Sequence, residues 1–195
     1  MSKTLILLFH PDLSGSRANA ALAGTALRLP DVEVIDMYAL YPDGSIDAEQ
    51  EVARLLSADR IVLQFPIQWY STPPLLKAWQ DAVLTRMYYI NYETEGRLLE
   101  GTPLLVAATA GNVPNAYAAD GANKFTMAEL LRPLEATAHR CGLPWQTPFM
   151  LFQANRLDDI ALYGAAKTYA QRLADWRTAT EPQEDFRRFL VEAWG

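Results

Sequence analysis

Three largely apolar runs constrain the fold of this chain more than any other feature of its sequence. They are residues 4–9 (TLILLF), 60–65 (RIVLQF) and 103–108 (PLLVAA). None of them alternates apolar with polar residues, so neither side of these segments is suited to face water. Runs of this length are typical of strands that are covered on both faces, as in a parallel sheet between two layers of helices.

Two weaker segments, residues 32–36 (VEVID) and 149–152, would complete five strands. Helix-like stretches lie between and after them, at residues 16–29, 47–57, 73–84, 125–141 and 157–177. Regular alternation of strand and helix is the sequence form of a doubly wound α/β sheet. We therefore expect an α/β domain with a five-stranded parallel sheet in the order 2-1-3-4-5 and helices on both faces.

Two segments exceed what a minimal domain of this kind needs. Residues 85–101 are rich in aromatics (MYYINY) and long for a connection between a helix and a strand. In the tail, apolar residues recur at helical spacing: Phe186, Phe189, Leu190 and Trp194. We expect residues 1–179 to form the α/β domain and residues 180–195 to form an amphipathic helix docked on it or on a partner subunit.

Charge and composition exclude several classes of function. The net charge of −6 disfavours a nucleic-acid partner, because neutralisation of phosphates supplies most of that affinity. Cys141 is the only cysteine, so no internal disulfide can form, and no Cys/His cluster has metal-ligand spacing. No segment approaches the roughly 20 apolar residues of a membrane span, and no signal-peptide cleavage site follows the start. We expect a cytoplasmic protein without a metal site or direct membrane insertion.

Ligands of such sheets bind beyond the carboxyl ends of the strands, where the strand order reverses. The first loop there, HPDLSGSRAN, offers hydroxyls, a cation and the start of a helix, which together suit a phosphate. An ordinary turn with Ser16 as the helix N-cap is the alternative interpretation. The chain has no GxGxxG and no GK[ST] motif, which disfavours a Rossmann site or an NTPase.

Two further loops are expected at the same edge. The loop PIQWYSTPP places a Gln-Trp-Tyr run directly after a buried strand, which suits a planar heterocycle, although these aromatics could instead cap the core. The loop TAGNVPNAYAADGANK is rich in small residues, which let the backbone approach a ligand closely. Three such loops at one crevice favour a binding site.

These motifs together resemble the NAD(P)H:quinone oxidoreductase family, which includes DT-diaphorase, modulator of drug activity B and the bacterial reductases ancillary to glutathione-regulated potassium efflux. The resemblance rests on HP…SxAN, QFPIQWYSTPPLLKAW, TAGN…Y and CGL, and the efflux-ancillary branch also shares LYPD…ID and LxATAxxCGL. It implies a flavodoxin-like fold, FMN (or FAD) as cofactor and NADPH or NADH as hydride donor. It also implies two-electron reduction of a quinone or similar small aromatic acceptor through flavin N5, in a homodimer whose interface would occupy residues 87–92 and the terminal helix.

The resemblance also assigns roles residue by residue. It implies that the flavin phosphate and ribityl chain are held by His10, Ser16, Arg17, Ala18 and Asn19. It implies that the isoalloxazine is bordered by Ile67, Gln68, Trp69 and Tyr70, and at its other edge by Thr109, Ala110, Gly111 and Asn112. The family has a Thr-Thr-Gly-Gly type turn at that edge, from which this chain departs at Ala110 and Asn112. Tyr117 matches a catalytic position near the flavin. Asn123 stands where relatives have a histidine that handles charge on the reduced flavin, or it merely makes a turn.

The resemblance leaves the biological role open. A regulatory flavoprotein subunit that binds a potassium antiporter, and so lies peripherally at the inner membrane, is an alternative to a quinone reductase. An azoreductase or nitroreductase would use the same chemistry on another acceptor. A serine hydrolase is not expected, because the sequence has no G-x-S-x-G motif.

Overall fold

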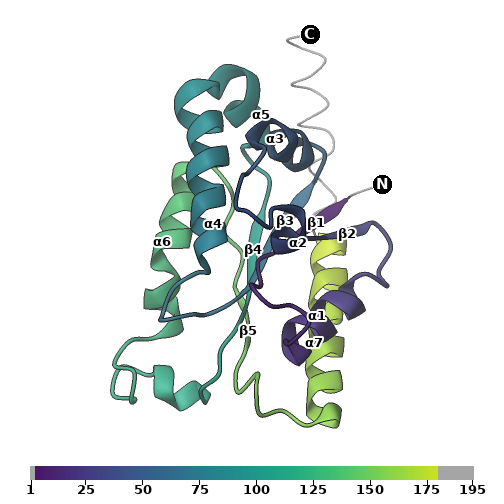
Figure 1. Ribbon diagram of the computed structural model, residues 1–195, viewed down its shortest axis with the longest axis vertical. Helices are drawn as coiled ribbons and strands as arrows, with labels where there is room; N and C mark the ends of the chain where they lie inside the picture. The colour runs from purple at the N-terminus through teal and green to yellow at the C-terminus, as the bar shows by residue number, and fades with distance from the viewer. Residues whose placement is uncertain (1–2, 180–195) are drawn as a thin grey trace.

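A five-stranded parallel sheet forms the centre of the computed structural model, which describes residues 3–179 (Figure 1). Its strands are β1 (Thr4–Leu8), β2 (Val32–Asp36), β3 (Arg60–Pro66), β4 (Leu104–Thr109) and β5 (Phe149–Leu151). They lie in the order β2-β1-β3-β4-β5, and every neighbouring pair is parallel. The predicted fold class and strand order are confirmed.

Burial along the strands explains their composition. β1 and β4 are buried at every position, which is why their sequences are apolar except for one threonine each. β2 is an edge strand whose residues are all only partly buried, and it can carry charge. Its Glu33 forms an ion pair with Lys3 (2.7 Å) and lies 3.9 Å from the Arg54 guanidinium.

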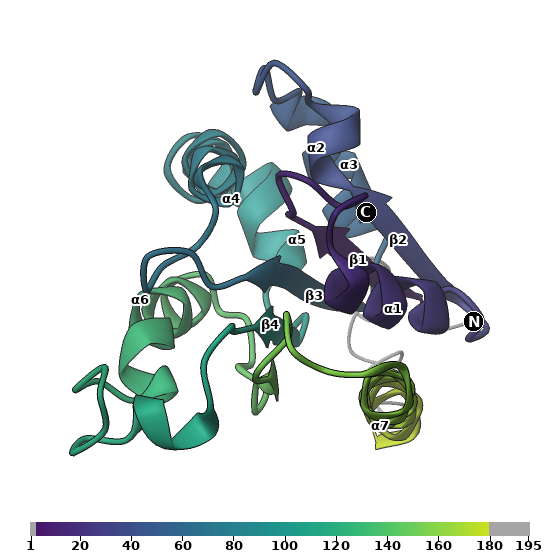
Figure 2. The same cartoon turned by 60° about the horizontal axis from the view of Figure 1, so that its bottom comes forward.

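Helices cover both faces of the sheet, as predicted. They are α1 (Arg17–Ala26), α2 (Met37–Leu40), α3 (Ala48–Leu56), α4 (Pro74–Trp79), α5 (Arg97–Leu99), α6 (Met127–Arg140) and α7 (Asp159–Ala179). α1 and α7 lie side by side on one face, where Leu22 and Tyr169 pack with Ile6 of β1 (Figure 2). α3, α4 and α6 cover the opposite face, where alternate β1 residues such as Leu5 point. The period-2 geometry of a strand thus supplies both cores from one continuous apolar run.

The aromatic-rich excursion is helical rather than an irregular connection. After α4 the chain continues in π-helical turns at Gln80–Leu84, Arg86–Ile90 and Tyr92–Gly96. Gly96 is required at its position, because a Cβ atom there would lie 2.5 Å from the carbonyl oxygen of Met87. Arg86 donates to Glu95 through both Nε (3.0 Å) and Nη2 (2.8 Å), which links the second and third of these turns.

A buried carboxylate links three of the helical elements on this face. Glu51 of α3 is fully buried; its Oε1 accepts hydrogen bonds from the Tyr41 hydroxyl (3.0 Å) and from Arg54 Nε (3.1 Å). Its Oε2 accepts from Trp79 Nε1 of α4 (3.0 Å). Burial, together with the neighbouring Glu51 carboxylate, raises the pKa of Tyr41 to about 12. Glu51 therefore satisfies polar groups that would otherwise be buried without partners.

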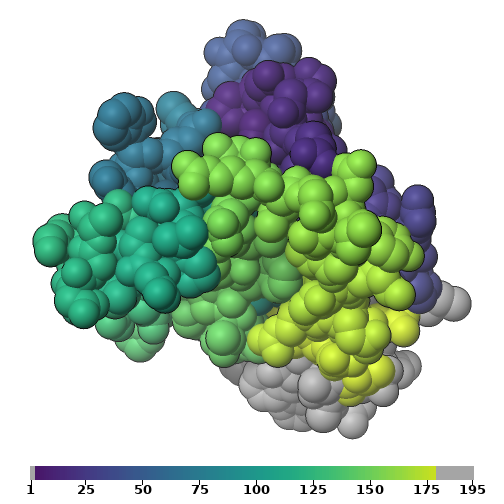
Figure 3. Space-filling model, turned by 90° about the horizontal axis from the view of Figure 1, so that it is seen from below, coloured from purple at the N-terminus to yellow at the C-terminus, as the bar shows by residue number. Residues whose placement is uncertain are grey.

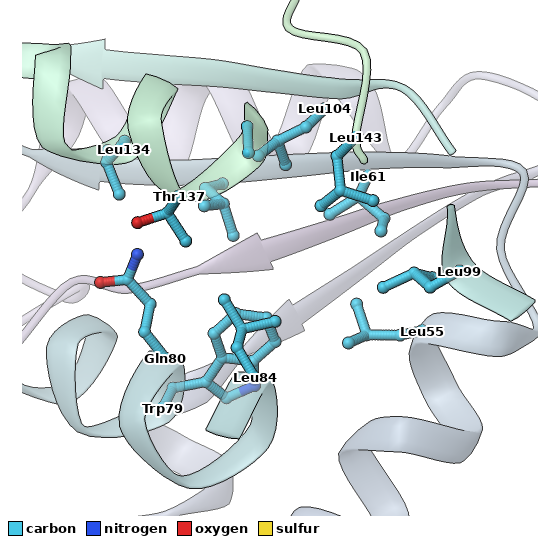
Figure 4. A pocket seen from close by; sticks show the side chains of 12 residues that line it. Leu55, Ile61, Trp79, Gln80, Leu84, Leu99, Leu104, Leu134, Thr137 and Leu143 are labelled. Atoms are coloured by element: carbon cyan, nitrogen blue, oxygen red, sulfur yellow. The ribbon is translucent and has the colours of Figure 1, made fainter. Parts of the chain in front are cut away.

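The ring of Trp79 borders a small internal cavity (Figure 4). The cavity measures about 20 Å³ and is lined mostly by leucines, among them Leu55 of α3, Leu104 of β4 and Leu134 of α6. Gln80 and Thr137 place polar side chains at one end of it. This face of the core is thus slightly underpacked where α4 passes into its π-helical continuation.

Among residues 3–179, no helix is both long and apolar enough to cross a membrane. The predicted amphipathic helix at residues 180–195 lies outside the described residues.

Candidate functional site

The carboxyl ends of β1, β3 and β4 open into a cleft of about 460 Å³. The predicted residues that line it are His10, Ser16, Arg17, Ala18, Asn19, Ile67, Gln68, Thr109, Ala110 and Gly111. A second hollow of about 260 Å³ shares Ile67 and Gly111 with the cleft and is lined further by Trp69, Tyr70, Asn112, Tyr117 and Asn123. Figure 3 views this end of the molecule, where the purple first loop, the teal loop after β4 and the green loop after β5 gather. The structure therefore brings all the predicted residues together, and their roles stay predictions.

The start of α1 forms one end of the cleft. Ser16 is the N-cap of this helix, and its Oγ accepts from the backbone N–H of Asn19 (3.3 Å). The N–H groups of Arg17 and Ala18 belong to the first turn, where no helical carbonyl can accept them. Because Ser16 Oγ acts as an acceptor inside the protein, its own proton stays available. The N-cap and the ligand-binding interpretations of Ser16 are therefore geometrically compatible.

The side chain of Arg17 is engaged away from this helix start. Its Nη2 pairs with the Asp159 carboxylate at the start of α7, and its Nη1 donates to the carbonyl of Leu157 (3.2 Å). Arg17 thus fastens the loop after β5 to α1. Its backbone N–H remains the group that it offers to a ligand at the helix start.

His10 and Asp12 fix the shape of the first loop. His10 Nδ1 accepts from the backbone N–H of Asp12 (3.1 Å), and burial lowers the pKa of the imidazole although the nearby Asp12 carboxylate opposes this. His10 is therefore neutral at pH 7 with its ring proton on Nε2, where it can donate. Asp12 Oδ1 accepts from Ser14 Oγ (2.8 Å) and from the N–H of Gly15 (3.1 Å), which lowers the pKa of Asp12.

The Gln-Trp-Tyr segment forms a tight turn with an unusual backbone. Gln68 and Ser71 exchange backbone hydrogen bonds of 2.9 and 3.0 Å, and the two residues between them, Trp69 and Tyr70, have φ values of 47° and 64°. Two positive φ angles define a type I′ turn, which favours Asn-Gly and is strained for bulky side chains. Trp69 is 95% exposed and Tyr70 50%, so the interpretation that they cap the core is wrong.

Relief of this strain gives a first prediction. Replacing Trp69→Asn together with Tyr70→Gly should raise the free energy of unfolding by about 1–2 kcal/mol, because these residues tolerate the left-handed region. Urea denaturation followed by circular dichroism measures the change. The matched control is Trp69→Ala with Tyr70→Ala, which removes the same rings but keeps the backbone strain. Equal stability of the two double variants would contradict the prediction.

The loop after β4 brings Tyr117 and Asn123 to the second hollow. The N–H of Asn123 donates to the carbonyl of Ala116 (2.9 Å), so Asn123 does make a turn. Its Oδ1 also accepts from the Tyr70 hydroxyl (3.4 Å), which connects this loop to the tight turn that contains Trp69 and Tyr70. The Tyr117 ring packs on Phe152, with centroids 5.6 Å apart. Burial raises the pKa of Tyr117, with a smaller effect from Tyr70, so its phenol stays protonated at neutral pH.

Sequence reasoning missed one wall of the cleft. Ala154 and Asn155, from the loop between β5 and α7, line it, and the N–H of Ala154 donates to the carbonyl of Ala110 (3.0 Å). Asp12, Gly15 and Pro66 also line the cleft and were not singled out as binding residues. Ala154 and Asn155 follow the carboxyl end of a strand, and that position was the only sequence signal for them.

Residues 2–173 match the model of a protein family described as having a flavodoxin-like fold. The chain belongs to this flavodoxin-like family. The match includes every strand of the sheet and every loop of the cleft, so the family assignment covers the whole candidate site.

Several proteins similar to this chain carry functional names. The glutathione-regulated potassium-efflux system ancillary protein KefG of Cronobacter sakazakii is 42% identical over 176 residues, which cover 89% of this chain and 94% of KefG. The general stress protein 14 of Treponema denticola, solved in complex with FMN, is 36% identical with a TM-score of 0.80 and covers 89% of this chain and 98% of its own. An NADPH-quinone reductase from P. pentosaceus is 32% identical with a TM-score of 0.77, and the match covers 87% of this chain and 96% of the reductase. The predicted relationship to flavin-dependent NAD(P)H oxidoreductases is confirmed.

Proposed function

We propose that this protein is an FMN-dependent NAD(P)H:quinone oxidoreductase that transfers two electrons to its acceptor. The observation that carries the proposal is that a polar cleft and an aromatic hollow adjoin each other. The cleft at the start of α1 offers hydrogen-bond donors, and it passes at Ile67 and Gly111 into a hollow bordered by aromatic side chains. A ligand with a phosphate at one end and a planar ring at the other matches both.

The donor set at the start of α1 fits the phosphate of FMN. Ser16 supplies a hydroxyl proton, the first turn supplies unpaired N–H groups, and neutral His10 supplies Nε2–H. The positive end of the helix dipole adds to this without any net positive charge on the chain. The FMN complex of the Treponema denticola relative supports the choice of FMN over FAD.

The second hollow fits the ring of the flavin and a stacked partner. Trp69 and Tyr70 are held outward by the strained turn, and Tyr117 faces the same space. Bound FMN supplies the chemistry itself, acceptance of a hydride from NAD(P)H and its delivery to the acceptor. The protonated Tyr117 phenol can donate a hydrogen bond, whereas Asn123 can donate but cannot change charge at neutral pH. We propose that these two residues stabilise negative charge without exchanging a proton with solvent.

The absorption spectrum of the purified protein tests the cofactor, and acid release followed by chromatography separates FMN from FAD. Steady-state oxidation of NADPH and of NADH with a soluble quinone then tests the activity. We expect one FMN per chain and quinone-dependent oxidation of NAD(P)H. The rate of this oxidation should fall tenfold or more in the Trp69→Ala/Tyr70→Ala variant. A purified protein that takes up no flavin, or that holds flavin without quinone-dependent turnover, would contradict the proposal.

The similarity to KefG supports a second candidate, a regulatory subunit on a potassium efflux protein. Contact with such a partner would require an exposed surface, and Tyr89 and Ile90, at the tip of the π-helical segment, are each 72% exposed. The same surface suits the homodimer expected from the family resemblance. The homodimer, the cytoplasmic location and an azo or nitro compound as acceptor stay predictions.

A further inference from the structure

A chain of buried amides lies beneath the start of the cleft. Asn19 of α1 and Gln64 of β3 are 1% and 0% exposed. Gln64 Nε2 donates to the backbone carbonyl of Asn19 (3.0 Å) and, more weakly, to Asn19 Oδ1 (3.4 Å). Asn19 Nδ2 donates to Thr109 Oγ1 (3.0 Å) and Ser16 Oγ (3.3 Å). Four residues from three elements thus form one connected network.

The direction of every bond in this network follows from one group. The backbone carbonyl of Asn19 can only accept, so the Gln64 atom beside it must be Nε2. Gln64 Oε1 then faces the hydroxyl of Tyr169 on α7, which donates to it (3.4 Å). With Nε2 of Gln64 fixed, Oδ1 of Asn19 faces Gln64 and its Nδ2 faces the two hydroxyls. The amide orientations are therefore determined rather than free.

This direction decides what the two hydroxyls present to the cleft. Ser16 Oγ and Thr109 Oγ1 both accept from Asn19, so neither proton points into the network. Both residues line the cleft, so their hydroxyl protons are free to point into it and to donate to a ligand there. In the opposite amide orientation, Asn19 Oδ1 would take up these protons and the cleft would face oxygen lone pairs, which repel phosphate oxygens.

We propose that Gln64 is a positioning residue which, through the amide of Asn19, sets the Ser16 and Thr109 hydroxyls as donors and makes this end of the cleft selective for an anionic ligand group. Gln64 does not line the cleft, so it acts only through Asn19. The inference rests on the proposed FMN function, and it concerns the preference for a phosphate rather than the presence of a flavin site.

Full-length protein freed of flavin is titrated with FMN and with riboflavin, which lacks the phosphate, and the ratio of the two dissociation constants is compared between variants. Gln64→Met keeps the side-chain length but removes both polar atoms. We expect it to lower the preference for FMN about tenfold or more, the scale of a hydrogen bond to a charged group, and to change riboflavin affinity little. Gln80→Met, at a glutamine outside the cleft, is the matched control and should keep the wild-type ratio.

Gln64→Glu provides a second variant with a different readout. A protonated carboxyl group at this position can still donate to the Asn19 carbonyl, whereas the carboxylate cannot. The preference of this variant for FMN should therefore fall, relative to the wild type at the same pH, as the pH rises through the pKa of the introduced carboxyl group, which burial raises. Lowering the pH should restore the preference. This variant remains informative even if Gln64→Met does not fold.

The possible outcomes distinguish the phosphate site at α1 from the role of Gln64. A wild-type protein that binds FMN and riboflavin equally would overturn the phosphate site at α1 and the selectivity with it. A wild-type preference that survives in Gln64→Met, or a variant that loses both ligands in equal measure, would overturn the role of Gln64 alone and leave the proposed function standing.

Discussion

Ser16→Asp should weaken FMN binding by about a thousandfold and leave the fold intact. Aspartate is as good an N-cap as serine, so α1 keeps its first turn. The new carboxylate, however, lies where we place the flavin phosphate. Two like charges about 4 Å apart repel by about 4 kcal/mol at an effective dielectric constant of about 20, which corresponds to three powers of ten in affinity.

Ser16→Asn isolates the effect of the charge in that experiment. Asparagine also caps helices well and has nearly the shape of aspartate, but it is neutral. Fluorescence titration of the flavin-free variants gives the two dissociation constants, and urea unfolding verifies that both proteins are folded. Equal FMN affinity in the aspartate and asparagine variants would show that the phosphate binds elsewhere and that Ser16 is only an N-cap.

Glu51→Ala should lower the free energy of unfolding by about 3–5 kcal/mol, because it breaks a buried ion pair and leaves other donors without an acceptor. The indole N–H of Trp79 and the hydroxyl of Tyr41 both lose their partner inside the protein. Because Glu51 is fully buried, water does not replace the lost carboxylate as the acceptor for these donors, as it would at the surface.

Glu49→Ala is the matched control, since Glu49 lies on the same helix with an exposed side chain. It should change stability by no more than about 0.5 kcal/mol. Both variants are compared by urea denaturation at pH 7, and flavin content in the folded state should be unchanged because Glu51 is not part of the cleft. A cost below about 1 kcal/mol for Glu51→Ala would mean that the network does not stabilise this face.

The three central strands were predictable because they are buried on both faces and are therefore mostly apolar, as Leu5 to Leu8 of β1 show. The expected helix at residues 73–84 covers the first π-helical turn, but the turns at Arg86–Ile90 and Tyr92–Gly96 were not predictable, because i to i+5 bonding leaves no 3.6-residue period in the sequence. The requirement for glycine at residue 96 was hidden as well, because it comes from the close approach of the Met87 carbonyl, which only the folded chain shows. The short helix α2 depends on Asp36, whose carboxylate caps it at the end of a strand.

The site was predictable where a loop combined a strand end with distinctive side chains, as at Ser16 and Trp69. The loop after β5 had the strand end but only Ala154 and Asn155 to mark it, and small or common residues carry no signal. The pairing of Arg17 with Asp159 was equally hidden, because the two are far apart in sequence. The sequence indicated a cation at the first loop, and only the folded chain shows that Arg17 is paired with Asp159.

The ion pair of Arg17 with Asp159 joins segments that are far apart in the chain, and the lining of the cleft likewise comes from the loops after β1, β3, β4 and β5. No partial stretch of the polypeptide presents this surface, so a ligand that fills it binds the native state alone. Free ligand at a hundredfold excess over its dissociation constant then adds about 2.7 kcal/mol to stability. Under the proposed function, the lifetime of the protein under heat or proteolysis would therefore depend on the supply of FMN.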